Sequence, residues 1–245
     1  MNRQKIVSDF FLMKIPVKEC GEKLVALGDY AKDILIDLDP LTKKNEKFRD
    51  TECYVRESVA IMLAQVQGFL HPSYRLKITD GFKSLETQKK LYAMVFDDIK
   101  SNNPEWSVEK IKKEVDKWVA NPLTVPPHTT GGAVDVTLVT PSGKEMDMGT
   151  TLNAISEKCF TFCKDISQQA QNNRALLINV MKKVGFVNYP GEWWHWCYGD
   201  RMWAYYTKNS YALYEGLTNS PIRNVKTKGI KMNKHLILDK EVEKK

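Results

Sequence analysis

Apolar residues recur along the chain at two different spacings, which predict both helices and strands. A spacing of three to four residues predicts helices over residues 107–120 and 174–184, a largely apolar segment predicts a buried helix over 56–70, and residues 84–99 are also predicted to be helical. Alternating polar and apolar residues predict a strand at 76–80, and a β-branched run after Gly131 and Gly132 predicts another at 132–139. The order of these elements is consistent with an α+β domain.

Two of the predicted helices form an excursion over about residues 84–121, between the strand at 76–80 and the loop before the strand at 132–139. We expect them to form a wall or a lid over a cleft. Residues 1–217 are predicted to form one domain. Beyond them the periodicity is lost and Lys and Arg accumulate, so residues 218–245 are predicted to be a basic tail, with the apolar residues 236–238 docking on the body.

Length and composition favour a cytoplasmic protein with a full core. The chain has 245 residues, of which 42% are hydrophobic, and it contains no run of 18 apolar residues that would span a membrane. Asp9 and Lys14 interrupt the apolar stretch near the start, so no cleavable signal is expected. The five cysteines are odd in number, which fits reduced thiols. Cys159 and Cys163 have the spacing of one helical turn, and we interpret them as small helix residues rather than metal ligands or a redox pair.

Charge alone does not identify a partner. The net charge of +7 permits contact with anionic polymers. The chain has no zinc-finger spacing, no aromatic segment typical of RNA-binding domains and no phosphate-binding Gly-rich loop. We therefore expect no nucleic-acid partner, and we interpret the basic end as a solvated tail.

Two short segments contain the residue types of a hydrolytic zinc site. His128 and Asp135 lie in the first, and Glu192 and His195 lie in the second. A catalytic zinc normally takes three protein ligands and leaves a position for water, and a further carboxylate can act as general base. Any single histidine is more often a hydrogen-bonded core residue than a ligand, so the significance lies in the combination.

The spacing within each segment predicts its local geometry. On a strand at 132–139, Asp135 faces away from the apolar side chains Val134 and Val136, and so faces a cleft or water. The loop through Gly131 and Gly132 must fold back to bring His128 close to Asp135. Residues 192 and 195 would point to opposite faces of a regular strand, so a turn is expected after Pro190-Gly191.

Both segments resemble the signature pair of the D-alanyl-D-alanine dipeptidases, the VanX-like branch of the M15 zinc peptidases. That pair is approximately Ser-x-His-x-x-Gly-x-Ala-x-Asp and Glu-Trp-Trp-His. The similarity extends to Asp80-Gly-Phe-Lys83, to Asp147-Met-Gly149 and to the helix with Asn173-Arg174, and it covers about residues 25–205. The two motifs in this order are a specific signal. The resemblance implies a small antiparallel central sheet flanked by helices, as in the Hedgehog and DD-peptidase fold.

The resemblance also implies a role for each matching residue. His128, Asp135 and His195 would hold one Zn²⁺ per chain, and Glu192 would take a proton from the attacking water and pass it to the leaving amine. Lys83 would stabilise the oxyanion. Substrate contacts are expected from the remaining matched positions, Asp80, Asn153 and Trp194.

Three positions depart from the family pattern. Lys83 replaces an arginine and loses its planar, bidentate hydrogen bonding. Pro126 replaces a serine, and Asn153 replaces an aspartate that is expected to pair with the free ammonium of the substrate. The last two changes concern substrate recognition more than metal binding, so the hypothesis is a conserved zinc site with altered specificity.

Three functions fit these observations. The first is hydrolysis of D-Ala-D-Ala or a related D-amino-acid dipeptide. The second is a DD- or LD-carboxypeptidase-like activity on longer muropeptides, which a weaker ammonium pocket would allow. The third is a weakly active or non-catalytic peptide-binding protein that keeps zinc for structure, although nothing would then explain the presence of Glu192.

Overall fold

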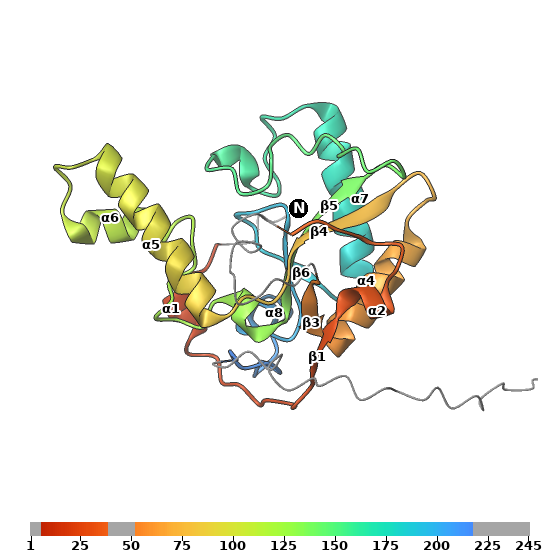
Figure 1. Cartoon of the computed structure of the whole chain (residues 1–245), viewed down its shortest axis with the longest axis horizontal. Helices are drawn as coiled ribbons and strands as arrows, with labels where there is room; N and C mark the ends of the chain where they lie inside the picture. Colours follow the sequence, from red (N-terminus) through yellow and green to blue (C-terminus); the bar gives the residue numbers. More distant parts are fainter. Residues whose placement is uncertain (1–5, 39–51, 218–245) are drawn as a thin grey trace, which may run out of the picture.

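The structure is a computed structural model, and it describes residues 6–38 and 52–217 (Figure 1). The predicted tail, residues 218–245, lies outside the described residues, as does its apolar segment 236–238. In chain order the elements are α1 (Asp9–Leu12), β1 (Leu24–Ala26), α2 (Leu27–Tyr30), β2 (Leu35–Ile36), β3 (Tyr54–Arg56), α4 (Glu57–Phe69), β4 (Arg75–Asp80), α5 (Leu85–Asn102), α6 (Val108–Val115), the 3₁₀ turn η1 (Pro127–Thr130), β5 (Ala133–Val139), the 3₁₀ turn η2 (Glu157–Cys159), α7 (Gln168–Lys183), β6 (Val187–Asn188), β7 (His195–Cys197) and α8 (Arg201–Thr207).

The five-stranded central sheet has the order β2-β4-β5-β7-β6. The pairs β4–β5, β5–β7 and β6–β7 are antiparallel, as predicted, but the edge strand β2 runs parallel to β4, so the prediction of an antiparallel sheet is wrong at that edge. β1 and β3 form a separate antiparallel pair. The α+β fold class is confirmed.

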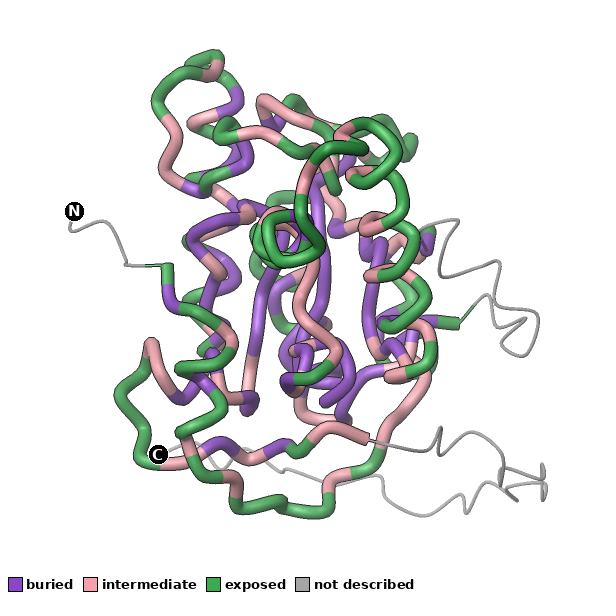
Figure 2. The backbone as a smooth tube through the Cα atoms, turned by 90° about the vertical axis from the view of Figure 1, so that its left-hand side faces the viewer, coloured by how far each residue is buried: buried purple, intermediate pink, exposed green. Residues whose placement is uncertain are grey.

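One face of the sheet packs against helices α4 and α7, which lie beside each other in Figure 1. The inward side chains of β5, Val134, Val136 and Leu138, are fully buried in this core. Burial of each such side chain contributes about 1.5–3 kcal/mol. Figure 2 shows the central strands buried along most of their length. Because side chains alternate along a strand, the core on one face leaves Asp135 on the other.

The predicted helices all form, although three of them, α5, α6 and α7, have different limits, and α5 continues to Asn102 rather than ending near residue 99. α5 begins directly after Ser84, whose hydroxyl caps it by accepting a hydrogen bond from the Thr87 amide at 3.1 Å. α6 ends at Val115 rather than at residue 120, and irregular turns follow. α7 begins at Gln168, six residues before the predicted start, because Ser167 caps it by accepting from the Ala170 amide at 3.0 Å.

The segment with Cys159 and Cys163 is not a regular helix. Cys159 ends the 3₁₀ turn η2, and Cys163 lies beyond it. The interpretation of both as residues of one helix is therefore wrong, and both are free thiols in the structure.

Helices α5 and α6 project from the sheet as an arm, which is at the left of Figure 1. Two hydrogen bonds tie the returning chain to α5: Gln88 Nε2 donates to the Ala120 carbonyl at 2.9 Å, and the Tyr92 hydroxyl donates to Asp116 at 2.8 Å. The chain then enters η1, so the arm starts and ends beside the sheet face that carries Asp135. Among the described residues, every helix is too short or too polar to cross a membrane.

Candidate metal centre

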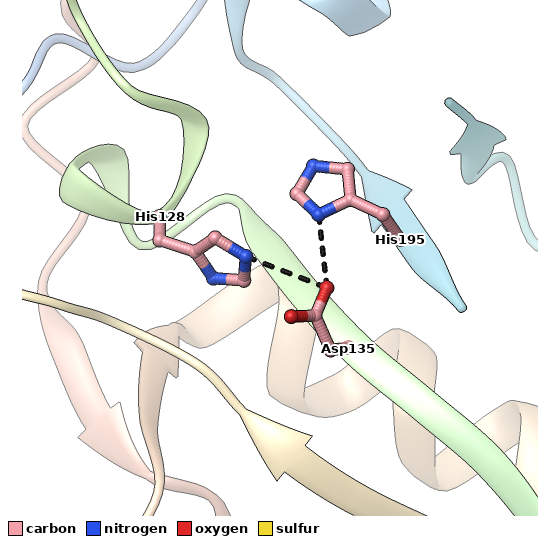
Figure 3. Close-up of side chains that lie close together, drawn as sticks. All are labelled: His128, Asp135 and His195. Atoms are coloured by element: carbon pink, nitrogen blue, oxygen red, sulfur yellow. Dashed lines mark hydrogen bonds and ion pairs between the residues drawn. The ribbon is translucent and has the colours of Figure 1, made fainter. Parts of the chain in front are cut away.

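Three side chains that are far apart in the sequence meet on the face of the sheet opposite α4 and α7 (Figure 3). β5 and β7 pair in a register that places Asp135 directly opposite His195, and η1 brings His128 to the end of β5. His195 Nδ1 lies 2.9 Å from Asp135 Oδ1, and His128 Nε2 lies 3.4 Å from the same oxygen. One potential ligand atom from each residue lies within 4.8 Å of the others, and all three residues are buried.

The loop between His128 and Asp135 folds back as its glycines require. Gly131 has a φ of +72°, in the left-handed region that favours glycine. A Cβ on Gly132 would collide with the backbone oxygen of Tyr198, so only glycine fits this close approach. The prediction of a tight return is confirmed.

Neighbouring groups fix which nitrogen of each imidazole faces Asp135. His128 Nδ1 lies 2.8 Å from the Gly81 carbonyl oxygen, which can only accept, so Nδ1 donates to it and Nε2 is the nitrogen that faces Asp135. His195 Nε2 lies 3.3 Å from Cys197 Sγ, which leaves Nδ1 for a metal. Such outer contacts orient ligating histidines and set their tautomers.

Cys197 connects His195 to the start of α8. Burial, reinforced by the Asp200 carboxylate, raises the pKa of the Cys197 thiol well above its usual range. The thiol therefore keeps its proton and donates a hydrogen bond to the Asp200 side chain. Asp200 in turn accepts a hydrogen bond from the Trp203 amide at 2.7 Å and caps α8. The orientation of His195 therefore depends on a continuous buried chain.

The charge of Asp135 is stabilised by its neighbours. Burial alone would raise the pKa of Asp135, but His128 and His195 outweigh it and hold the pKa well below its usual range. Two neutral imidazole nitrogens and one carboxylate are a donor set that suits zinc, and three protein ligands leave a fourth position open. These residues therefore fit the metal.

Glu192 lies in the turn that was predicted before His195. The Glu192 amide donates to the Tyr189 carbonyl at 3.1 Å, and the His195 amide donates to the Glu192 carbonyl at 3.3 Å. Burial raises the pKa of Glu192 to about 7, with Asp135 raising it further and His195 and Lys83 lowering it. A carboxyl group with this pKa can both take and release a proton near neutral pH.

A cavity of about 120 Å³ adjoins the three ligand candidates and Glu192. Lys83, Asn153 and Trp194 also line it, as do Gln88, Leu91 and residues 116–120 of the arm. The arm thus forms one wall of the cavity. Its lining residues do not include Asp80, whose carboxylate lies 2.8 Å from Lys83 Nζ.

Lys83 is positioned by both its backbone and its side chain. Its amide donates to the His128 carbonyl at 3.2 Å, and its ammonium forms the ion pair with Asp80 while only 9% of the side chain is exposed. Two hydrogen bonds therefore tie the segment after β4 to the loop with His128. The Lys83 amide donates to the His128 carbonyl, and the His128 imidazole donates to the Gly81 carbonyl.

Asn173 and Arg174 of α7 hold the segment that leads to Asn153. Arg174 donates hydrogen bonds to the carbonyls of Met148, Phe160 and Lys158, each at 2.8 Å. Asn173 Nδ2 donates to the Asp147 carbonyl at 2.7 Å. Asn153 itself has a φ of +59°, which asparagine tolerates better than most residues. Its position in the cavity wall follows from this scaffold.

Several residues of the centre were not predicted. The Gly81 carbonyl and Cys197 act on the histidines, and Asp9 and Tyr189 line the cavity. Cys197 could have been identified, since it lies two residues after His195 on the same strand face. A backbone carbonyl and an aspartate more than 100 residues away in the sequence have no local signal.

The α+β fold and a buried His-Asp-His set that could hold a metal ion, with Glu192 in the wall of the same cavity, are the arrangement expected of a metallopeptidase. Comparison with known families identifies which one. The sequence profile of peptidase family M15, described as D-ala-D-ala dipeptidase, matches residues 24–214. The chain therefore belongs to this family.

Individual relatives agree with the family assignment. The D-alanyl-D-alanine dipeptidase of Synechocystis sp. is 27% identical over 219 residues, covering 79% of this chain and 88% of its own. That of Enterococcus faecalis is 24% identical over 144 residues, covering 56% of this chain and 70% of its own. A solved structure described as VanYB in complex with D-Alanine-D-Alanine is 16% identical, with a TM-score of 0.43 over 64% of this chain and 79% of that chain.

Proposed function

We propose that this protein is a zinc-dependent dipeptidase that hydrolyses D-Ala-D-Ala or a related D-amino-acid dipeptide. The observation that carries the proposal is the convergence of His128, Asp135 and His195 beside Glu192 at the end of one small cavity. The family profile and the named relatives support the dipeptide as substrate class.

The ligands of one zinc ion would be His128 through Nε2, His195 through Nδ1, and the carboxylate of Asp135. When bound there, zinc polarises the scissile carbonyl and lowers the pKa of water to about 7. The two outer contacts, from the Gly81 carbonyl and Cys197, hold the imidazoles in the required tautomers.

Glu192 would move the protons of the reaction. Its carboxylate takes a proton from the attacking water and its carboxylic acid gives that proton to the departing amine. Burial raises the pKa of Glu192 in the metal-free site, and a bound zinc ion would lower it toward the carboxylate form that accepts the first proton. The turn hydrogen bonds at Glu192 keep it beside the ligand strand β7.

Lys83 would stabilise the negative charge that develops on the carbonyl oxygen. Lys83 lines the cavity and its ammonium pairs with Asp80, which does not line it, so Asp80 would act by positioning Lys83. A lysine supplies the charge but not the two parallel hydrogen bonds of an arginine. Asn153 and Trp194, which line the same cavity, would contact the substrate.

A second candidate activity is the removal of a terminal residue from a longer wall peptide. The observation that favours it is the uncharged Asn153 in the cavity wall, which supplies no counter-charge for a free ammonium.

Substrate length tests the two candidates. Release of D-alanine would be measured from D-Ala-D-Ala and from a muropeptide-like tripeptide and pentapeptide, with Glu192→Gln as the inactive control. We expect turnover of the dipeptide, lost in Glu192→Gln. Turnover of the pentapeptide alone would transfer the proposal to a carboxypeptidase, and a wild-type protein that holds zinc but cleaves none of the three would reject both.

A further inference from the structure

The N-terminal segment places an additional acidic residue in the wall of the metal cavity. Asp9, at the start of α1, lines the cavity together with Glu192 and His195. Asp9 belongs to neither sequence motif, and it lies more than 100 residues before both of them. Its presence there has to follow from how α1 is anchored.

The anchoring of α1 is mainly apolar. Val7 and Leu12, on either side of Asp9, are buried in a cluster with Ala133 and Cys197 of the ligand strands β5 and β7. The Ser8 hydroxyl accepts from the Phe11 amide at 3.3 Å and begins the helix. The segment is therefore held against the sheet face that carries the metal centre.

Asp9 is electrostatically part of the centre. Burial raises the pKa of Asp9. The backbone amide of Asn121 donates a hydrogen bond to the Asp9 carboxylate and partly offsets this effect. The charge of Asp9 contributes to raising the pKa of Glu192 and that of Tyr189. It therefore acts on the groups that would surround a bound substrate.

The other carboxylates that line the cavity already have functions. Asp135 faces the two histidines, and Glu192 is the proposed proton carrier. Asp116 Oδ1 accepts from the Tyr92 hydroxyl at 2.8 Å and from Asn121 Nδ2 at 3.0 Å, which fixes it to the arm. Asp9 is the fourth acidic residue among those that line the cavity.

A dipeptide substrate requires a counter-charge close to the metal. Its ammonium is on the same residue as the scissile carbonyl, only two bonds of about 1.5 Å from that carbon. A charged partner for the ammonium must therefore line the same cavity, and Asn153 offers only a neutral oxygen. Asp9 meets this requirement.

We propose that Asp9 is a specificity-determining residue that binds the free ammonium of the substrate, and that Asn153 adds a neutral hydrogen bond beside it. This inference rests on the proposed function. It makes the N-terminal segment part of the binding site, and it explains how a chain with asparagine at position 153 can still select a dipeptide with a free amine.

Binding to an inactive protein tests this directly. In the zinc-loaded Glu192→Gln protein, calorimetry would compare D-Ala-D-Ala with N-acetyl-D-Ala-D-Ala, each with and without Asp9→Asn. We expect Asp9→Asn to weaken binding of the free dipeptide by about 10- to 100-fold, the usual effect of losing a charged hydrogen bond. Binding of the acetylated ligand should change little, which also shows that the variant folds.

Two further variants complete the test. Asp97→Asn, an exposed position on α5, makes the same charge change away from the cavity and should leave both affinities unchanged. Asn153→Asp added to Asp9→Asn should restore binding of the free dipeptide. Equal affinities with and without Asp9→Asn, or equal losses for both ligands, would overturn the inference.

Failure of the inference can be separated from failure of the proposed function. Wild-type turnover of D-Ala-D-Ala combined with no effect of Asp9→Asn on binding would reject the role of Asp9 alone. No turnover and no binding of the free dipeptide by zinc-loaded protein would reject the proposed function and, with it, the role of Asp9.

Discussion

Removing the ionisable group at position 192 should stabilise the metal-free protein at alkaline pH. Glu192→Gln keeps the shape of the side chain and removes its charge. The pKa of Glu192 is about 7 in the folded protein, against 4.5 for an ordinary glutamate, mainly because of burial. The folded state therefore binds this proton more tightly than the unfolded state does. The stability that this tighter proton binding contributes is fully present below pH 4.5 and is lost progressively as the pH rises through 7.

The magnitude follows from the two pKa values. One unit of pKa corresponds to about 1.4 kcal/mol, so ionised Glu192 destabilises the metal-free fold by about 3 kcal/mol at pH 8 and by about 1.4 kcal/mol at pH 5.5. Replacement by glutamine should remove this cost. The stabilisation by Glu192→Gln is therefore expected to be about 2 kcal/mol greater at pH 8 than at pH 5.5.

Urea denaturation of the metal-free protein at the two pH values measures this difference. Glu105→Gln, at an exposed position, is the matched control and should show no pH-dependent gain. Saturating zinc should reduce the gain, because a nearby dication favours the carboxylate. An equal effect of Glu192→Gln at both pH values, or destabilisation at pH 8, would refute the account of Glu192 as a carboxyl group with a raised pKa.

Substitutions at three other positions test separate parts of the structure. Cys197→Ala should weaken zinc binding by about 10- to 100-fold, because His195 Nε2 loses its partner, whereas Cys197→Ser should retain most of the affinity. Competition with a chromophoric chelator measures both affinities, and equal zinc affinities of the wild type and Cys197→Ala would exclude a role for the thiol. Lys83→Met should lower kcat by about two to three orders of magnitude with a smaller change in KM, and Lys83→Arg should retain or increase activity; an unchanged kcat in Lys83→Met would remove Lys83 from the reaction. Leu138→Ala should cost about 2–5 kcal/mol of unfolding free energy, measured in urea, while zinc affinity stays the same, since this side chain lies on the core face of β5 opposite the ligands.

Much of the fold could be predicted because long periodic segments dominate it. The helices α4, α5 and α7 and the strands β4 and β5 were all predicted from the sequence, and only their ends differed. β1, β2, β3 and β6 were not predicted, because segments of two or three residues are too short to show alternation. The parallel pairing of β2 depends on long-range contacts that no local pattern encodes.

The candidate metal centre could be predicted because its three candidate ligands lie in two compact segments, and the register of β5 with β7 joins them. The remaining features depend on tertiary packing. Asp80 has the residue type of a substrate contact, but the structure pairs it with Lys83. Asp9 reaches the cavity only because α1 packs on the strands that carry Asp135 and His195. Residues that act through such contacts are found by geometry rather than by motif.

A zinc titration during catalysis tests the central claim most directly. Zinc would be added stepwise to metal-free protein while release of D-alanine from D-Ala-D-Ala is followed and bound metal is measured in the same samples. The account predicts that turnover rises in proportion to bound zinc and levels off at one equivalent per chain, and that Glu192→Gln binds the same equivalent without turnover. Full activity in the metal-free protein, or one bound zinc with no activity toward the dipeptide, would contradict it.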